Sequence, residues 1–355
     1  MQFERNIVFW VATLAVLAVL LWLLSPILLP FVLGMAIAYL LDPLAKELTR
    51  RGMSRLVAAM LILGGFVVAF ALLVVMIAPI LAAQISGFIE NAPGYALRLQ
   101  ALVSDPSHPW IKRLVGDSLV GTDKSVGDLM NQAMGYLSGL LASLWARGRA
   151  LISIFSLLIL TPVVAFYLIC DWDRMVNSVD RLIPLQQRET VRRLGREIDA
   201  TISAYVRGQS GVCLILGSYY ALGLTFAGLS FGLLIGVVSG LISFIPYVGS
   251  LTALVLSLAV AVAQFFPDWS RILVIAGIVL FGQFLEGYVL APKLVGHSIG
   301  LHPVWPMFAL FAFGYLFGFV GLLLAVPLAA ATGVLIRFAL RRYLASPYYT
   351  GSRPS

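Results

Sequence analysis

A single carboxylate lies within a long apolar stretch in the C-terminal half of the chain. Glu286 is the only Asp, Glu, Lys or Arg between Ile272 and Pro292, and Gln283 precedes it by three residues, on the same helical face. A carboxylate in a hydrophobic segment is costly and is a functional hypothesis by default. The two side chains could hold a cation, a proton or a polyol. The alternative is structural: Glu286 pairs with Lys293 or extends to a membrane interface.

Glycine and proline residues interrupt the apolar segments around this carboxylate. The runs 240–246 and 321–327 both begin with Gly-Leu and end in proline, a weak internal repeat. Such interrupted segments are typical of transporter binding sites. We expect two broken hairpins, with a non-helical break at Pro246–Gly249 in the first and arms Val304–Phe317 and Val320–Ile336 in the second. The candidate substrate- and ion-binding residues are Glu286, Gln283, Pro246, Gly249, Lys293, Pro292 and Pro327.

Four glycines recur every four residues in the first hairpin region: Gly228, Gly232, Gly236 and Gly240. A stripe of small residues lets two helices approach closely. We expect it to serve helix packing, and lining of a substrate path is the alternative.

The sequence lacks the motifs of metal sites, of ATP hydrolysis and of serine hydrolases. His297 and His302 have no carboxylate or cysteine at ligand spacing, so no metal site is expected. The chain contains no His-Glu-x-x-His motif, no Walker A loop and no Gly-x-Ser-x-Gly motif. Cys170 and Cys213 lie at or within apolar segments, where small buried hydrophobes are expected. We therefore expect neither an enzyme nor a cofactor.

The composition places the chain in a membrane. Hydrophobic residues make up 61% and charged residues 11% of the sequence, far from the averages of soluble domains. Uncharged apolar runs, each long enough for a helical crossing of roughly 20 residues, cover Ile7–Leu24, Leu56–Ala83, Leu151–Cys170 and Gly208–Pro267. We predict an all-α polytopic membrane protein with about eight to nine membrane segments, including two Gly/Pro-broken hairpins that either cross fully or re-enter.

Changes in composition divide the chain into five parts. Residues 1–83 hold the N-terminal spans, and residues 84–150 form a more polar external segment, either interfacial helices or a helical cap. Residues 151–207 contain a fourth span and an arginine-rich amphipathic helix. Residues 208–345 form the transport unit with both broken hairpins, and residues 346–355 are a C-terminal tail.

The net charge of +8 agrees with a membrane protein and does not argue for nucleic-acid binding. Basic residues cluster at Asp42–Arg55 and Asp171–Arg207, which predicts that these segments and both termini are cytoplasmic. This orientation places 17 of the 24 lysines and arginines inside and seven outside. The arginine-rich helix is either a solvated positive-inside face or a lever coupled to the transport unit.

Six short motifs occur together over nearly the whole chain. They are Asp42-Pro43 at the predicted end of the second span, Tyr205 to Gln209, Phe244 to Gly249, Glu286 to Lys293, Gly296 to Pro303, and Gly321 to Pro327. In this combination the chain resembles the autoinducer-2 exporter superfamily of bacterial membrane proteins. The resemblance implies a homo-oligomeric inner-membrane transporter. Members are linked to export of the quorum-sensing signal autoinducer-2, and some resemble sodium/proton antiporters.

These features together predict a secondary transporter that exports a small polar molecule, similar to autoinducer-2, coupled to or driven by an ion gradient. A sodium/proton antiporter that uses the same Glu286 is the first alternative, and a passive channel or membrane scaffold is the second. The expected partners are membrane lipid, a small polar substrate, sodium ions or protons, and further copies of the chain. No nucleic acid is expected.

Overall fold

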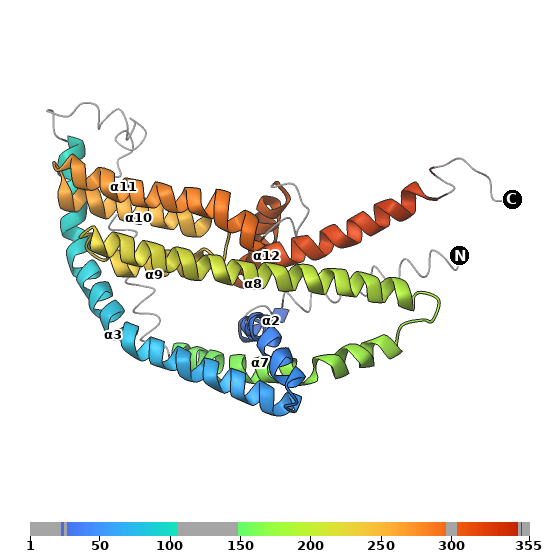
Figure 1. Cartoon of the computed structure of the whole chain (residues 1–355). Coiled ribbons are helices and arrows are strands. Elements are labelled where there is room, and N and C mark those ends of the chain that lie inside the picture. The colour runs from blue at the N-terminus through green and yellow to red at the C-terminus, as the bar shows by residue number, and fades with distance from the viewer. Residues whose placement is uncertain (1–22, 25–26, 105–147, 296–303, 347–348, 350–355) are drawn as a thin grey trace. The chain divides into compact units, whose positions relative to one another are not determined.

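The computed structural model describes residues 23–24, 27–104, 148–295, 304–346 and 349, which form helices joined by short turns, with no strand among them (Figure 1). The predicted all-α class is confirmed. Most of the first predicted span and of the external segment lie outside the described residues, as do the Gly296–Pro303 motif and most of the C-terminal tail. The elements are α2 (Leu29–Arg50), α3 (Arg55–Ser104), α7 (Gly148–Arg181), α8 (Arg188–Phe226), α9 (Gly232–Ile242), α10 (Val248–Phe265), α11 (Trp269–Phe284), η2 (Leu285–Val295) and α12 (Val304–Leu344).

Six helical segments in the described part are long and apolar enough to cross a membrane. They are α2, α3, α7, α10, α11 continued by η2, and α12, and the shorter apolar helix α9 adds to them. Helices satisfy their backbone hydrogen bonds internally, as a lipid environment requires. The polytopic membrane class is therefore confirmed, while the number of eight to nine segments stays a prediction.

Three helices extend beyond their expected ends. α2 continues through Pro43 to Arg50, so the helix extends beyond Asp42-Pro43, and the predicted end of the second span at these residues stays a prediction. Proline removes one N–H donor, but a helix tolerates this loss where neighbouring groups compensate for it. α3 extends past Ala83 to Ser104. The predicted arginine-rich helix and the start of the apolar run Gly208–Pro267 are one helix, α8, of 39 residues.

The chain forms two compact units. The first contains the residues up to Val67, Ser156–Gly208, and the residues from Val295 onward. The second contains Val68–Phe155 and Gln209–Leu294. α3, α7 and α8 each run from one unit into the other, so the units share continuous helices.

Small residues let the helices of the first unit pack closely. A Cβ atom at Gly34 on α2 would lie 2.8 Å from the Cβ of Val164 on α7, nearer than such atoms approach. This close approach is the usual way in which helices pack in membranes, where van der Waals contact replaces the hydrophobic effect between helices. The buried core around it consists of Ala38, Leu41, Ala45, Ala59, Leu63, Ala165 and Ile169, from α2, α3 and α7.

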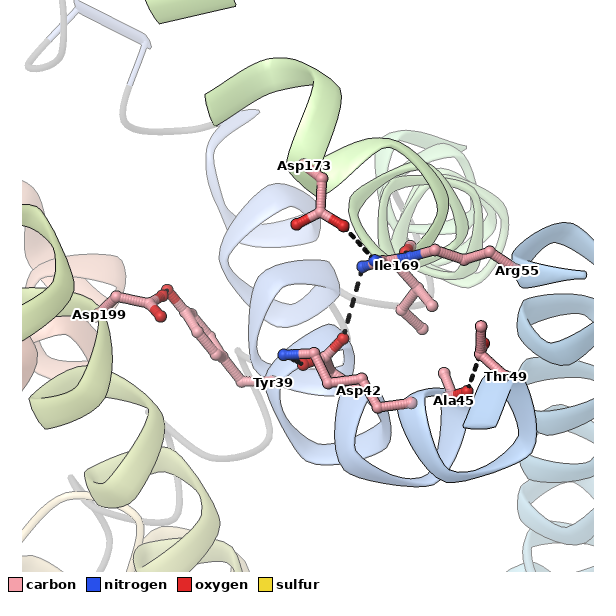
Figure 2. Close-up of polar contacts among 9 residues, drawn as sticks. Tyr39, Asp42, Ala45, Thr49, Arg55, Ile169, Asp173 and Asp199 are labelled. Atoms are coloured by element: carbon pink, nitrogen blue, oxygen red, sulfur yellow. Dashed lines mark hydrogen bonds and ion pairs between the residues drawn. The ribbon is translucent and has the colours of Figure 1, made fainter. Parts of the chain in front are cut away.

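Arg55, the first residue of α3, joins three helices by polar contacts (Figure 2). Its Nε donates to the carbonyl of Ile169 on α7 at 2.9 Å. Its guanidinium pairs with Asp173 on α7 and lies 3.7 Å from the carboxylate of Asp42 on α2. The Arg55 side chain is 28% exposed and that of Asp173 is 67% exposed, so the part-buried hydrogen bond to Ile169 stabilises the helix ends more than the ion pair does. Asp42 therefore has a structural partner within this unit.

A second polar contact in this unit joins α2 to α8. The Tyr39 hydroxyl donates to Asp199 at 2.8 Å (Figure 2). The ring of Tyr39 also packs edge-on against Trp172 of α7. α2 is thus held to both α7 and α8.

α12 contains the second predicted hairpin, and its two arms meet at Gly318. This residue has φ 60° and ψ −138°, a conformation that glycine adopts without strain from a side chain. The arms then pack together, because a Cβ atom at Gly321 would lie 2.6 Å from the carbonyl carbon of Phe313. Pro327 is buried within the second arm and not at the break. The repeated prolines Pro246 and Pro327 therefore do not occupy equivalent positions.

The second unit packs α9, α10 and α11 beside the second half of α8 (Figure 1). A Cβ atom at Gly236 would lie 2.6 Å from the backbone of Tyr220, and one at Gly240 would lie 2.8 Å from the nitrogen of Gly217. Gly232 approaches the backbone of α8 in the same way. Three of the four glycines in the stripe therefore serve helix packing.

Candidate functional site

The Glu286 carboxylate lies where α11 changes its winding. α11 ends at Phe284, and the π-helix η2 that follows has Glu286 in its first turn. Pro292 within η2 lacks the backbone donor that regular α-helical winding would use. π-helical turns are rare and occur frequently at functional sites. The irregular winding therefore coincides with the one acidic residue of this apolar segment.

α11 and η2 run antiparallel to the second half of α8. The Tyr219 hydroxyl donates to the carbonyl of Ile278 at 2.9 Å. Toward the other end, a Cβ atom at Gly211 would touch the side chain of Leu294 at 3.5 Å. Glu286 lies between these two contacts along the helix and is half-buried.

Polar groups from two other helices surround Glu286. Ser250, in the first turn of α10, lies near enough to Glu286 to interact with its carboxylate, while its hydroxyl donates to the carbonyl of Tyr247 at 3.2 Å. Cys213 and Tyr220 on α8 lie near enough to interact electrostatically with it. Gln283, one turn earlier on α11, is half-buried as well. The site thus draws on α8, α10, α11 and η2, all within the second unit.

The predicted break in the first hairpin is present, but it begins earlier than expected. α9 ends at Ile242 and α10 begins at Val248, so the non-helical stretch covers 243–247. Tyr247 has φ 68°, a left-handed conformation that bulky residues rarely adopt. Gly249 is already in α10, and a Cβ atom there would lie 2.5 Å from the Cα of Ser243. The position of this break within the depth of the membrane stays a prediction.

Further buried polar groups lie at the break and on the neighbouring helices α8 and α9. Gln209 donates from Nε2 to the carbonyl of Ser243 at 2.5 Å, and the Ser243 hydroxyl donates to the carbonyl of Ser239 at 2.8 Å. The hydroxyl oxygens of Tyr220 and Ser239 are buried and have no hydrogen-bond partner within the described part of the chain. A buried unpaired hydroxyl costs free energy and needs an explanation.

Sequence reasoning missed most of these hydroxyl groups. Ser239, Ser243, Ser250 and Tyr220 are not among the candidates taken from motifs, although each interrupts an apolar run. That interruption was the available signal. It is weak because serine and tyrosine are common in apolar helices, where a serine hydroxyl can bond to its own backbone.

The other predicted site residues form no ion pair or hydrogen bond with Glu286 in the described part of the chain. Pro246 is half-buried in the break, while Pro292 and Lys293 are exposed on η2. Among the described residues no ion pair joins Lys293 to Glu286. The structural alternative of a Glu286–Lys293 pair therefore has no support in this arrangement. Pro327 belongs to the first unit and the other six candidates to the second.

The polar groups around Glu286 offer oxygen atoms, which are hard ligands. A carboxylate, hydroxyl groups and backbone carbonyls near a helix break suit a sodium ion or a proton, and carboxylate and hydroxyl groups also bind hydroxyl-rich solutes. The structure shows no group of three or more His, Cys, Asp or Glu residues that could hold a metal ion in the part it describes. The two histidines considered in the sequence, His297 and His302, lie outside that part.

The sequence is similar, along nearly its full length, to proteins that are named as transport proteins or permeases. Residues 8–341 match the model of the family described as AI-2E family transporter. YrrI of Bacillus subtilis is 29% identical, over 90% of this chain and 89% of its own. PerM of Escherichia coli strain K12 is 28% identical, over 86% and 85%. The AI-2 transport protein TqsA of Escherichia coli strain K12 is 27% identical, over 90% and 86%.

Proposed function

This chain belongs to the AI-2E transporter family, and on that premise we propose that it is a secondary transporter that exports a small polar molecule with the help of an ion gradient. Family membership and the apolar helices make it a multi-pass membrane protein. The bacterial inner membrane is its proposed location, with both termini in the cytoplasm. No step of this proposal needs enzymatic chemistry or a cofactor.

One observation carries the proposal: the Glu286 carboxylate lies in a π-helical turn and close to Ser250, which lies just after the helix break. Two discontinuous helices therefore meet at one ionisable group. In secondary transporters, substrate and coupling-ion sites are typically formed by such discontinuous helices. A carboxylate in this place can take up a proton or a cation on one side of the membrane and release it on the other.

The surrounding groups suit a substrate that carries hydroxyl groups. Glu286 and Ser250 can accept hydrogen bonds, and the amide of Gln283 can both donate and accept. The unpaired hydroxyls of Tyr220 and Ser239 would gain partners from a polar solute or its water shell. TqsA, a relative, is named an AI-2 transport protein, and a small molecule of that polar kind is the substrate class we propose here.

A sodium/proton antiporter is the second candidate function. It is favoured by the same donor set, since one carboxylate with hydroxyl and carbonyl oxygens can bind sodium and a proton in turn. In that case Glu286 would be the exchanging group itself, and no organic substrate would be needed.

Transport by purified protein in liposomes tests both candidates. Sodium and proton gradients are imposed separately, and fluxes of a candidate solute, of sodium and of protons are measured across pH. We expect Glu286→Gln to remain folded by size exclusion but to lose flux or its pH dependence. Glu90→Gln, an exposed carboxylate on α3, serves as the matched control.

The outcomes separate the candidates clearly. Solute flux that depends on an ion gradient supports the exporter, and sodium–proton exchange without solute supports the antiporter. Solute flux without any counter-ion dependence would indicate a channel, and no flux at all would indicate a scaffold. Unchanged flux and pH dependence in Glu286→Gln would remove Glu286 from the mechanism.

Homo-oligomer formation is part of the same proposal. In the candidate span Arg55–Asn91 on α3, only 6% of the residues in its apolar stretch are buried against the rest of the described structure. An apolar surface of this kind is covered by lipid or by another copy of the chain. The mass of the detergent-solubilised protein, measured by light scattering with the detergent subtracted, decides between a monomer and an oligomer.

A further inference from the structure

Arginine side chains gather where α8 and the end of α12 meet in the first unit. They line a small hollow of about 330 Å³. Its full lining consists of Arg193, Leu194, Glu197, Phe338, Arg341 and Arg342. The hollow belongs to the first unit and Glu286 to the second, and the transport proposal does not use the hollow.

The positive charges in this hollow exceed the negative ones. Its single carboxylate, Glu197, lies 3.8 Å from the guanidinium of Arg337 on α12. Arg341 donates from Nε to the backbone carbonyl of Arg337 at 3.3 Å, which is a neutral partner. Across the described residues, no carboxylate forms an ion pair with Arg193, Arg341 or Arg342. Three exposed guanidinium groups therefore remain available to an anion.

The hollow also has an apolar side, and it lies at the end of a membrane-spanning helix. Leu194 and Phe338 are half-buried between the arginines. The residues from Leu294 to Ile336 carry no Asp, Glu, Lys or Arg, and the arginines of α12 follow directly. Arginines at this boundary keep their charge near the headgroup layer, while the apolar groups face the acyl region.

We propose that this hollow binds the headgroup of an anionic phospholipid. The phosphodiester would accept hydrogen bonds from Arg193, Arg341 and Arg342, because guanidinium groups present several donors that match phosphate oxygens. The part of the acyl chains nearest the headgroup would lie along Leu194 and Phe338. A soluble phosphate lacks these chains, so the apolar side favours the lipid as the ligand. The proposal does not depend on the role of Glu286.

Native mass spectrometry of the full-length protein tests the site, with phosphatidylglycerol compared with phosphatidylcholine. We expect tighter retention of phosphatidylglycerol by the wild type. The triple variant R193Q/R341Q/R342Q should bind phosphatidylglycerol more weakly, by about fivefold for each arginine and on the order of 100-fold together. Phosphatidylcholine binding should not change.

Two further variants make the result specific. R193K/R341K/R342K keeps the charge and should retain most of the preference for phosphatidylglycerol. R50Q/R51Q/R174Q removes three exposed arginines elsewhere in the same unit and should behave as the wild type. Equal loss in this control and in the R193Q/R341Q/R342Q variant would show a general charge effect and overturn the site.

Competition with a soluble anion distinguishes the two possible sources of phosphate. Glycerol phosphate added in excess should displace little phosphatidylglycerol, because it lacks acyl chains. Complete displacement would assign the hollow to a soluble phosphate and overturn the lipid proposal. If the glutamine variant does not fold, the salt dependence of lipid retention is measured on the wild type and the lysine variant. Retention of phosphatidylglycerol that does not change with salt would also contradict the proposal.

Discussion

Gly282 on α11 lies directly against the ring of Tyr220 on α8, so closely that a Cβ atom at Gly282 would lie 2.5 Å from the Tyr220 hydroxyl oxygen. The two residues set the distance between the helices beside Glu286. Even the smallest side chain at position 282 would push Tyr220 aside or separate the helices. The geometry of the candidate site therefore depends on a glycine one turn before the carboxylate.

Gly282→Ala should destabilise the protein by about 1–3 kcal/mol, the usual cost of overpacking. Thermal unfolding in detergent measures this. The matched control is Gly277→Ala on the same helix, where a Cβ atom would meet nothing within 4 Å. Alanine is a better helix former than glycine by up to about 1 kcal/mol, so the control should be neutral or stabilising. Equal destabilisation by both changes would contradict the packing argument.

Tyr220→Phe removes a buried hydroxyl that has no hydrogen-bond partner in the described residues. We expect the variant to unfold at the same temperature as the wild type or at a higher one, because an unpaired buried hydroxyl costs about 1–3 kcal/mol. Transport should nevertheless fall if the hydroxyl contacts the substrate or its water shell. A stable variant with wild-type transport rates would show that this hydroxyl has no part in the site.

Gly249→Leu should impair transport more than it impairs membrane expression. A Cβ atom at Gly249 would lie 2.5 Å from the Cα of Ser243, so a leucine must displace the break that precedes α10. Gly277→Leu places the same side chain on an exposed, open position of α11 and is the control. Flux per amount of folded protein in liposomes is the measurement. Similar flux from the two variants would argue against a role for the break.

Arg55→Ala should destabilise the first unit by about 1–3 kcal/mol, because it removes charge-assisted hydrogen bonds to α7 and a contact to Asp42. Arg51→Ala is the comparison, since Arg51 pairs with Glu47 on the surface, and such pairs contribute about 0–1 kcal/mol. Melting temperatures in one detergent compare the two variants. A larger loss from the Arg51 change would contradict the assigned contacts.

The predicted orientation places Ser54, beside the basic Asp42–Arg55 segment, in the cytoplasm and Ser270 outside. Both positions are exposed in the structure. Single cysteines at these positions, in a background without Cys170 and Cys213, are treated with an impermeant thiol reagent in intact cells. We expect labelling at position 270 and protection at position 54. The reverse pattern would invert the topology.

The sequence alone determined the class of this protein and its most prominent ionisable group. Long uncharged apolar runs are stable in lipid as helices, since a helix satisfies its own backbone hydrogen bonds. Glu286 is conspicuous for the same reason, because a carboxylate within such a run is visible without knowledge of its neighbours. The break near Pro246 was also predictable, since proline and glycine act on the local backbone.

Only the tertiary structure decided what surrounds Glu286. Ser250 and Tyr220 come from two different helices, and a serine in a helix can always bond to its own backbone, as Ser243 does with the carbonyl of Ser239. The sequence therefore cannot distinguish a self-satisfied hydroxyl from one that faces a neighbour. The π-helical turn and the close contact between Gly282 and Tyr220 likewise depend on how α8 and α11 pack, because side chains distant in sequence set the spacing between helices.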